Sequence, residues 1–348
     1  MATKSKTTGP YAYVSNSASS SVTVIDTSNP SNPTVVGSPI RVGSNPAGLV
    51  LTPKEDFLYV ANSNSVSHSV SVIDTRNNKA VCKIDVGNKV GLFPTSMAIS
   101  QDGTTIYAGL MYPDNENTFR MRDAVCAIDT KTNKVIAMID ISFGGMPVIN
   151  QWPSSKGGCG GVGTLAMRPN VPELYVPIGY ANKIAVIDTS SKCVTRTFPA
   201  GSGPGLAFDP NNSQQYYEVC TYNLNFAVFN ASTDSYSSPT IAIEGTPEVV
   251  AVSPNSSRIY VLCVDPRKPT DTDRNVAVIV PGNPVSYIAI PMVPSALAFT
   301  QDSKYAYVVG GGDDAKLFVI RTDLNQVIDS ISLPEGGADG IVIGKQTY

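Results

Sequence analysis

Two carboxylates, Glu248 and Asp339, are the residues best suited to acid–base chemistry. Each occupies the second position of a short apolar segment that recurs seven times along the chain, and the other five second positions are uncharged: Ala47, Thr95, Gly163, Pro204 and Ser295. If the segments converge on one axis, both side chains point toward one mouth of a channel. Two carboxylates repel in a partly dry cavity, so at least one should have a raised pKa, as a general acid or base needs. The alternatives are a solvated pair at a watery opening and a bound cation.

Positive charge for an anionic ligand could come from Arg120, Arg122 and Arg267. Arg120 and Arg122 alternate, so on an extended segment both would face the same side. A guanidinium group suits a carboxylate or another anion because it offers two parallel donors. Simple solvation at the surface is the alternative for each of these arginines.

Several aromatic residues could form the wall of a pocket for an apolar ligand. The only tryptophan lies in the longest insertion of the repeat. Core packing is the alternative role for these side chains. The candidates are Phe93, Tyr112, Phe119, Trp152 and Tyr222.

A thiol and an imidazole give a second possible chemistry. Cys159 is flanked by two glycines on each side, and glycine lets backbone N–H groups approach a ligand closely. A nucleophilic thiol needs a nearby base, and His68 is the only histidine. A flexible glycine linker with an idle thiol is the simpler interpretation, and spacing alone does not bring His68 to Cys159.

The elements that must position these residues form a repeat marked by tyrosine. Seven tyrosines end short strand-like runs at intervals of roughly 45 residues, with one longer gap: Tyr13, Tyr59, Tyr107, Tyr175, Tyr217, Tyr260 and Tyr307. Each is followed by a loop and an alternating strand such as SVSVID at 69–74. The pattern predicts an all-β, seven-bladed propeller with four-stranded blades, a radial architecture that leaves only short strand edges.

The two ends of the chain should close this ring. The chain opens on a run that matches the second strand of a blade, and 337–344 matches the first strand. We therefore expect 11–348 to be a single propeller domain, closed by pairing of the C-terminal strand with the N-terminal strands. Residues 1–10 are expected to be a disordered tail.

Three long loops fall on the face where the second-to-third-strand loops meet the loops between blades. They are 109–123 and 143–163 in blade three, and 263–275 in blade six. Long loops on a rigid scaffold commonly carry function, so we expect them to overhang the channel mouth. Solvated insertions without a role are the alternative.

The repeat resembles a known family. Runs such as YVAN at 59–62 and VSVIDT at 70–75, followed by a glycine-proline motif before the next blade, look like the YVTN-type β-propeller repeat. The resemblance covers essentially the whole chain, although blades five and six lack the Asp-Thr turn. It implies a seven-bladed propeller with lactonase-like and surface-layer-like relatives, but no single activity.

Composition excludes several functions. Charged residues make up 15% of the chain, the net charge is −3 and no basic stripe occurs, which argues against nucleic-acid and membrane partners. A single histidine excludes multi-histidine metal sites, and no dinucleotide fingerprint occurs, so we expect no metal and no cofactor. No apolar leader precedes the repeat and the six cysteines form no CxxC pair, which favours a cytoplasmic monomer with reduced thiols.

Two functions of different classes remain. The first is an enzyme that processes a small molecule by metal-free acid–base chemistry, such as lactone hydrolysis, cyclisation or isomerisation. The second is a non-catalytic propeller that binds a protein, peptide or glycan on its faces. A deep pocket that holds both acids favours the enzyme, and exposed aromatic patches at the rim favour the binding module.

Overall fold

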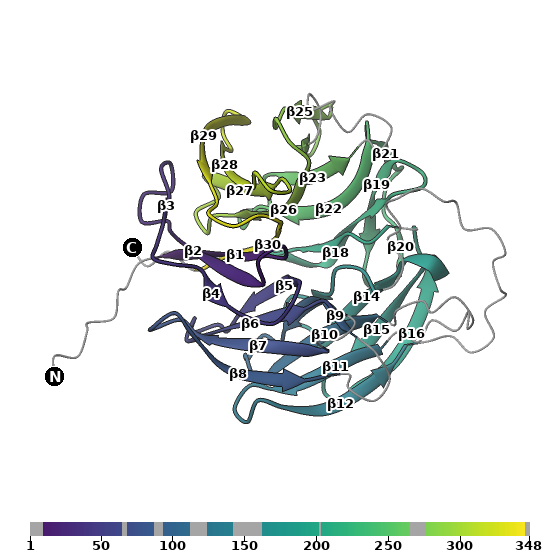
Figure 1. Ribbon diagram of the computed structural model, residues 1–348. Helices are drawn as coiled ribbons and strands as arrows, with labels where there is room; N and C mark the ends of the chain where they lie inside the picture. The colour runs from purple at the N-terminus through teal and green to yellow at the C-terminus, as the bar shows by residue number, and fades with distance from the viewer. Residues whose placement is uncertain are drawn as a thin grey trace, which may run out of the picture.

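The computed structural model describes residues 10–64, 68–86, 93–111, 124–141, 162–201, 203–264 and 276–344. Within these ranges seven antiparallel sheets follow one another around a ring (Figure 1). The seven-bladed, all-β propeller predicted from the tyrosine repeat is therefore confirmed. One short 3-10 turn, η1 (Gly179–Ala181), links two strands of blade four.

The strands fall into four tiers from the hub outward. The inner strands of blades one to seven are β30 (Ala338–Ile343), β5 (Pro46–Leu51), β9 (Phe93–Ile99), β13 (Ala166–Met167), β17 (Leu206–Asp209), β22 (Thr246–Val252) and β26 (Pro294–Phe299). The second strands, which carry the repeat tyrosines, are β1 (Tyr11–Asn16), β6 (Phe57–Asn62), β10 (Thr105–Met111), β14 (Glu173–Ile178), β18 (Asn212–Cys220), β23 (Ile259–Val264) and β27 (Tyr305–Gly310).

The third strands are β2 (Ser21–Asp26), β7 (Ser69–Asp74), β11 (Ala124–Asp129), β15 (Lys183–Asp188), β19 (Asn225–Asn230), β24 (Val276–Ile279) and β28 (Lys316–Arg321). The outer strands of blades two, three, four, six and seven are β8 (Lys79–Asp85), β12 (Lys134–Asp140), β16 (Cys193–Pro199), β25 (Ser286–Ile288) and β29 (Gln326–Ser332). In blades one and five the outer strand is split, into β3 (Thr34–Val35) and β4 (Ile40–Arg41), and into β20 (Ser235–Tyr236) and β21 (Ile241–Ala242).

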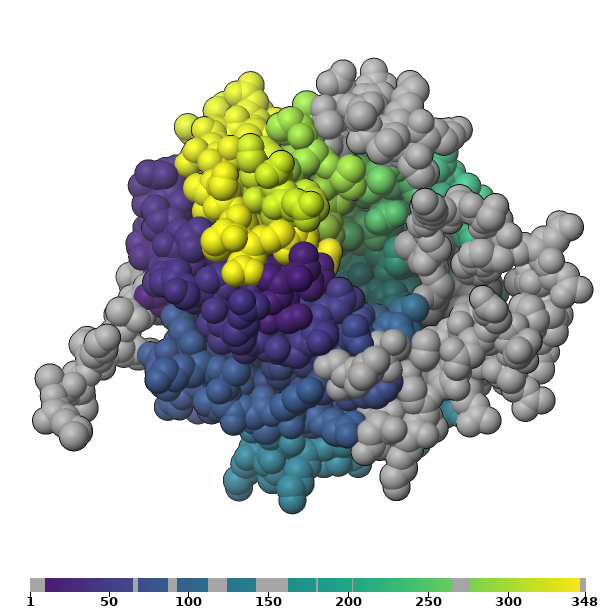
Figure 2. All heavy atoms as spheres, in the orientation of Figure 1, coloured from purple at the N-terminus to yellow at the C-terminus, as the bar shows by residue number. Residues whose placement is uncertain are grey.

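The ring closes by pairing of the two ends of the chain. β30 lies antiparallel to β1, with Tyr13 opposite Val342 and Val14 opposite Ile341. The C-terminal and N-terminal strands accordingly lie side by side, yellow against purple, in Figures 1 and 2. Closure by the last strand, as expected from the sequence, is confirmed. The expected disordered tail, 1–10, lies outside the described residues except for Pro10.

Burial on both faces of each blade explains why the second and third strands read as nearly continuous apolar runs. In β6, Tyr59 packs toward blade three against Ile106, whereas Leu58 packs toward blade one against Val24. In the described part of the chain, seven apolar clusters each join two adjacent blades. The core is thus a set of interfaces arranged around the ring.

The hub is closed by backbone contacts between neighbouring inner strands. A Cβ atom on Gly48, Gly163, Gly205 or Gly340 would lie within 3.0 Å of a carbonyl oxygen in the next blade. Those carbonyls belong to Thr95, Pro204, Glu248 and Ala47. Only glycine permits such a close approach, so its lack of a side chain is what lets the inner strands converge.

The repeat tyrosines form a second tie between blades. In five of the seven, the buried hydroxyl donates to the outer turn of the next blade, at Asn133, Thr189, Asp234, Asn325 or Pro30. Tyr260, for example, donates to Asn325 Oδ1 at 2.9 Å. Asn325 has a left-handed φ of 50°, a conformation that asparagine tolerates better than most residues.

We predict that Tyr260→Phe and Asn325→Gly each lower the free energy of unfolding by about 1 kcal/mol, because each removes one partly buried hydrogen bond. Glycine is chosen at 325 because it keeps the left-handed backbone. The double variant should lose less than the sum of the two single variants, since both remove the same bond. Urea unfolding measures all three.

Tyr305→Phe is the control for this cycle, because its hydroxyl makes no hydrogen bond that the described residues show. Its unfolding free energy should stay close to that of the wild type. Strict additivity of Tyr260→Phe and Asn325→Gly would mean that the bond between blades six and seven contributes nothing.

Candidate functional site

The loops that follow the second strands and the loops that lead into the inner strands share one face of the ring, called here the loop face. In blade one, Ser17 Oγ after β1 donates to the carbonyl of Gly337, just before β30, at 3.1 Å. In blade two, Asn45 Nδ2 before β5 donates to the carbonyl of Ser63, just after β6, at 2.7 Å. The sequence-based assignment of these loops to a common face therefore holds in both blades.

Glu248 and Asp339 both lie where an inner strand enters the hub from the loop face. In β22 the pairing with β23 steps from Pro247 to Val249, and in β30 the pairing with β1 steps from Ala338 to Gly340. Each acidic residue is therefore the extra residue of a β-bulge. A bulge takes its residue out of the regular in-and-out alternation of the strand and re-aims its side chain.

The same bulge occurs in other blades but carries an uncharged residue. The pairing steps over Thr95 in blade three and over Ser295 in blade seven. The position is thus a repeated feature of the hub, and the presence of a carboxylate there is particular to blades six and one. Blade seven, with Ser295, separates the two acids along the ring.

Glu248 is half-buried and held by blade five. Its carbonyl receives the close backbone approach of Gly205, and the carbonyl of the preceding Pro247 accepts a hydrogen bond from Thr221 Oγ1 at 3.1 Å. Burial raises the pKa of the Glu248 carboxyl. A carboxyl in this setting is shifted toward the neutral acid, which can donate a proton or a hydrogen bond to a ligand.

Asp339 is exposed to solvent, yet burial among the surrounding hub atoms raises its pKa, and a hydrogen bond from Ser17 lowers it in part. Both hold because the side chain can touch water on one side while the surrounding hub atoms limit how well its charge is hydrated. Because Asp339 is exposed and Glu248 is half-buried, the charged form of Asp339 keeps more of its hydration.

The cause of these shifts differs from the cause expected from the sequence. Repulsion between the two carboxylates was expected to raise at least one pKa. Both are raised, but for each the cause is burial, and the charge of the other acid makes no resolved contribution. The separation by a whole blade accounts for this, and the expectation of mutual repulsion was wrong.

The other nominated residues divide into those described and those outside the described residues. Phe93 begins β9 opposite Met111, and Tyr222 lies in the loop between β18 and β19 with 64% of its surface exposed. The backbone of His68 is tied to the outer strand of blade two, because its carbonyl accepts from Val86 N–H at 2.8 Å. The remaining seven lie outside the described residues: Tyr112, Phe119, Arg120, Arg122, Trp152, Cys159 and Arg267.

The expected long loops are tested only at their edges. β10 continues through Met111 and β23 through Val264, so the loops predicted to begin at 109 and 263 begin later. Gly109 is a strand residue that pairs with Val125. The rest of 109–123 and 263–275, and most of 143–163, lie outside the described residues.

The structure also brings forward an acid that the sequence analysis missed. Glu218, on β18, is fully buried, and one of its carboxylate oxygens has no hydrogen-bond partner among the described residues. Its signal in the sequence is its place after a repeat tyrosine. The corresponding residue in the other six blades is valine or alanine: Val14, Val60, Ala108, Val176, Val261 and Val308.

Two searches of the described residues bear on other kinds of site. No three His, Cys, Asp or Glu side chains gather there in a way that would hold a metal ion. No described helix has the length and apolar character needed to cross a membrane.

Comparison with known proteins supports the fold more than the family. A family model for the LVIVD repeat matches residues 2–39, a small part of the chain that includes β1, β2 and β3. This match does not confirm the YVTN-type resemblance. Among curated proteins, none matches the sequence.

Solved structures of several functions share the fold. A putative 6-phosphogluconolactonase from Bacteroides fragilis aligns with a TM-score of 0.73 at 12% identity, over 98% of this chain and 99% of that chain. Hydrazine synthase from Kuenenia stuttgartiensis gives 0.61 at 17% identity over 96% and 99%. A functionally unknown protein from Desulfotomaculum acetoxidans gives 0.69 at 13% identity over 97% and 99%. At these identities the likeness shows the fold alone.

We predict that Glu248→Gln stabilises the folded protein at neutral pH and not in acid. The stability contributed by a carboxyl whose folded pKa is raised is complete below its unfolded pKa of about 4.3 and is lost as the pH rises through the folded value. Glutamine keeps the shape and removes this loss. Urea unfolding between about pH 4 and pH 8 should show that the free energy of unfolding of the variant exceeds that of the wild type by an amount that grows as the pH rises.

Asp314→Asn is the control, because it removes one exposed negative charge from the loop between β27 and β28 on the same face. A gain in stability of equal size at every pH, or the same gain in Asp314→Asn, would contradict the assignment of a raised pKa to Glu248.

Proposed function

We propose that the protein processes a small organic molecule at the loop-face mouth of its channel by acid–base chemistry that uses no metal. The observation that carries this proposal is the pair of bulge residues, Glu248 and Asp339, whose pKa values burial raises while the other bulge positions are uncharged. Perturbed carboxyls at a recessed site are a recognised mark of functional positions. In Figure 2 the surface is recessed near the middle of the ring.

The two acids suit different parts of one reaction. Glu248 is the more buried and is the better general acid, since its neutral form can donate to a leaving group or a ring oxygen. Asp339 reaches water and is the better general base, because a carboxylate there can take a proton from an attacking water molecule. Lactone hydrolysis needs both roles, while cyclisation and isomerisation need the same two proton transfers in another order.

The remaining parts of the proposal come from the sequence. Arg120 or Arg122 would hold an anionic group of the substrate, and Tyr112, Trp152 and Tyr222 would cover an apolar part. The Bacteroides fragilis protein that shares the fold is a putative 6-phosphogluconolactonase, which makes sugar-acid lactones a reasonable first class of substrate to test.

We expect hydrolysis of δ-lactones of sugar acids, with and without a phosphate group, to fall about 10²–10⁴-fold in Glu248→Gln and in Asp339→Asn. Both variants should keep the circular dichroism spectrum of the wild type. Asp314→Asn, on the same face, should keep full activity. Activity that survives in both acid variants would contradict the assignment.

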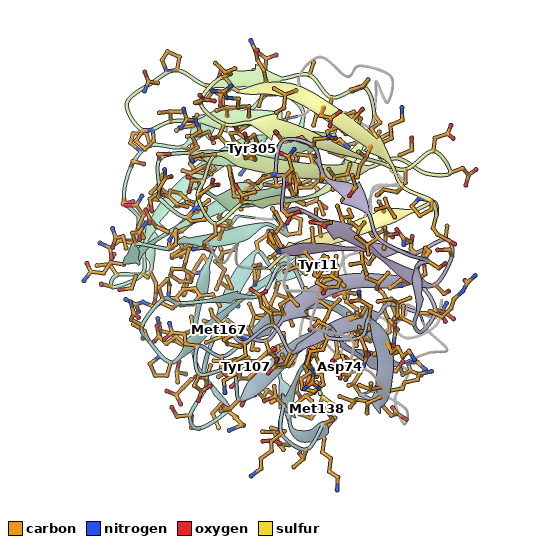
Figure 3. The ribbon with its side chains drawn as sticks, turned by 90° about the vertical axis from the view of Figure 1, so that its left-hand side faces the viewer. Tyr11, Asp74, Tyr107, Met138, Met167 and Tyr305 are labelled. Atoms are coloured by element: carbon orange, nitrogen blue, oxygen red, sulfur yellow. The ribbon has the colours of Figure 1, made fainter. Side chains whose placement is uncertain are left out.

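A non-catalytic binding module is the second candidate, and exposed apolar side chains favour it. Tyr222 and Tyr236 of blade five expose 64% and 54% of their surfaces. On β12, the outer strand of blade three, Ile136 and Met138 each expose 48%, and Figure 3 shows Met138 at the periphery. If every lactone is inert and the acid variants differ from the wild type only in stability, this second function is favoured.

A further inference from the structure

Glu218 lies in a part of blade five that the repeat normally makes apolar. It is fully buried on β18, with Leu206 opposite on β17 and Ala227 opposite on β19. Tyr216, on the same strand face, packs into the apolar cluster between blades four and five. A carboxylate in such a place would carry a large desolvation penalty unless it were paired or neutral.

One oxygen of Glu218 has a partner and the other does not. Oε2 accepts a hydrogen bond from Gly201 N–H at 3.1 Å, where the chain leaves β16 for the hub of blade five. Oε1 is buried without a partner among the described residues. Gly201 packs closely on this site, because a Cβ atom there would collide with Cys220 Sγ and lie 3.3 Å from Glu218 Oε1.

Two other buried polar atoms of blade five also lack a hydrogen-bond partner among the described residues. Asn225, which pairs with Cys220 across β18 and β19, has a buried Oδ1 without a partner among the described residues, and so has the hydroxyl of Tyr216. Oε1 and Oδ1 are both acceptors, and acceptors cannot satisfy one another. A proton on Glu218 would give this acceptor-rich site a donor, which neither Oε1 nor Oδ1 supplies.

In blade two, the equivalent site is filled by neutral groups that satisfy one another by hydrogen bonds. There Asn62 Nδ2 donates to Ser69 Oγ and Ser71 Oγ at 3.0 Å each, and Gly43 N–H donates to Ser71 Oγ at 3.2 Å. Asn62 and Ser69 correspond in register to Cys220 and Asn225 of blade five. The same glycine N–H thus points at a hydroxyl in blade two and at a carboxyl in blade five.

The groups around Glu218 provide no compensating cation. Burial raises its pKa to about 8 and the Gly201 N–H lowers it in part; no other described group contributes. Its titratable neighbours are Cys220 and Tyr216 on β18 and Tyr236 on β20, all neutral groups whose pKa values burial raises first and the Glu218 charge raises further.

The charged residues of the same interface are engaged elsewhere. Arg196, on β16, binds Glu173 at 2.6 Å, Asp234 at 2.6 Å and the Tyr175 hydroxyl at 2.8 Å. Lys183 begins β15 at the loop-face end of blade four, and its charge is not among the influences on Glu218. On β17, Asp209 binds Ser256 of blade six.

Glu218 is also connected to the proposed active site by direct contacts. The next residue, Val219, donates its N–H to the carbonyl of Gly205 at 3.1 Å. Gly205 in turn packs on the carbonyl of Glu248. A displacement of β18 at Glu218 would therefore be passed to the backbone of Glu248 within two contacts.

We propose that Glu218 is a proton-operated latch. As the neutral acid it occupies the buried site without a charge and β18 stays seated against Gly205; when it loses its proton, the buried carboxylate has only the Gly201 N–H to offset its desolvation, and this destabilises the loop-face end of blade five and the seat of Glu248. The effect on Glu248 rests on the function proposed above, whereas the protonation of Glu218 does not.

The direct test is infrared spectroscopy of the full chain near pH 6. The difference spectrum between wild type and Glu218→Gln should contain the C=O stretch of a protonated carboxylic acid, which is resolved from the carboxylate band. This band should disappear from the wild type as the pH is raised through about 8. A carboxylate band at pH 6 in place of the acid band would overturn the proposal.

Stability as a function of pH gives an independent readout. Between about pH 5 and pH 8 the unfolding equilibrium constant of the wild type should rise about tenfold per pH unit relative to that of Glu218→Gln, because folding there takes up one proton. Glu218→Val, which restores the residue of five other blades, should follow the glutamine variant and serves if that variant folds poorly. Parallel curves for wild type and both variants would overturn the latch.

Glu173→Gln is the matched control from the same interface. Burial acts to raise the pKa of Glu173, but hydrogen bonds from Arg196 and Arg168 outweigh it and the pKa is lowered. Its contribution has the opposite sign, so the stability lost in this variant should be largest at neutral pH and shrink as the pH falls. A control that shows the Glu218 pattern would mean that the pH dependence belongs to the interface as a whole, and this too would overturn the latch.

Turnover separates the latch from the proposed function. If a lactone is hydrolysed, its pH profile should lose its decline near pH 8 in Glu218→Gln, whereas an unchanged profile would overturn the connection to Glu248. If no lactone is hydrolysed but the acid band and the stability window are present, the latch stands and the proposed function fails.

Discussion

The close approach of seven inner strands at the hub is the constraint on which the rest of the structure depends. Gly48, Gly163, Gly205 and Gly340 each bring the backbone of one blade onto a carbonyl of the next. Hydroxyl groups reinforce the same contacts, as where Ser96 Oγ donates to the carbonyl of Gly163 at 2.8 Å. Beside three of these contacts a residue leaves the strand ladder as a bulge, namely Thr95, Glu248 and Asp339, and the bulge re-aims its side chain.

This constraint explains why a charge at a bulge position has chemical consequences. Side chains at the hub are surrounded by backbone from two blades, so the water around them is limited even where they are exposed. Ala47, Thr95 and Ser295 tolerate that environment without cost, whereas Glu248 and Asp339 have their pKa values raised by it. The scaffold thereby supplies the shift that acid–base chemistry requires, and no special neighbouring group is needed.

Much of the fold could be predicted from the sequence, because each blade repeats the same residue types at the same strand positions. The tyrosines mark the second strands, and their hydroxyls reach the next blade in most cases, as at Tyr59 and Asn133. The closing pair of β1 and β30 followed from matching the last run to the first strand of a blade. The hub positions of Glu248 and Asp339 followed from the same alignment, and the bulges there agree with it.

The rest depended on distances that a sequence does not contain. A raised pKa was anticipated for at least one hub acid, but its cause was not, since the alignment gave the order of the acids around the ring and not their separation. Glu218 was missed although its sequence signal is plain, because the interior of a strand is expected to serve packing and the loops and hub to carry chemistry. Cys159 and the arginines of the long loops were chosen from composition, and only contacts can test whether such residues meet.

Blade five gathers the departures from the repeat, and these departures are coupled. The ring of Tyr217 packs against blade six, but its hydroxyl donates to Asp209 of its own blade at 3.3 Å, and the hydrogen bond to blade six runs instead from Asn211 to Ser256. The interface on its other side contains Arg196 and Glu173 of blade four paired with each other and with Asp234 of blade five, together with Glu218, which has no counter-charge. Buried charges that are paired can be accommodated, while an unpaired one must be neutral or costly. The blade that departs most from the repeat is also the one whose Gly205 rests on Glu248, so a proton gained or lost inside it acts on the hub at the position where chemistry is proposed.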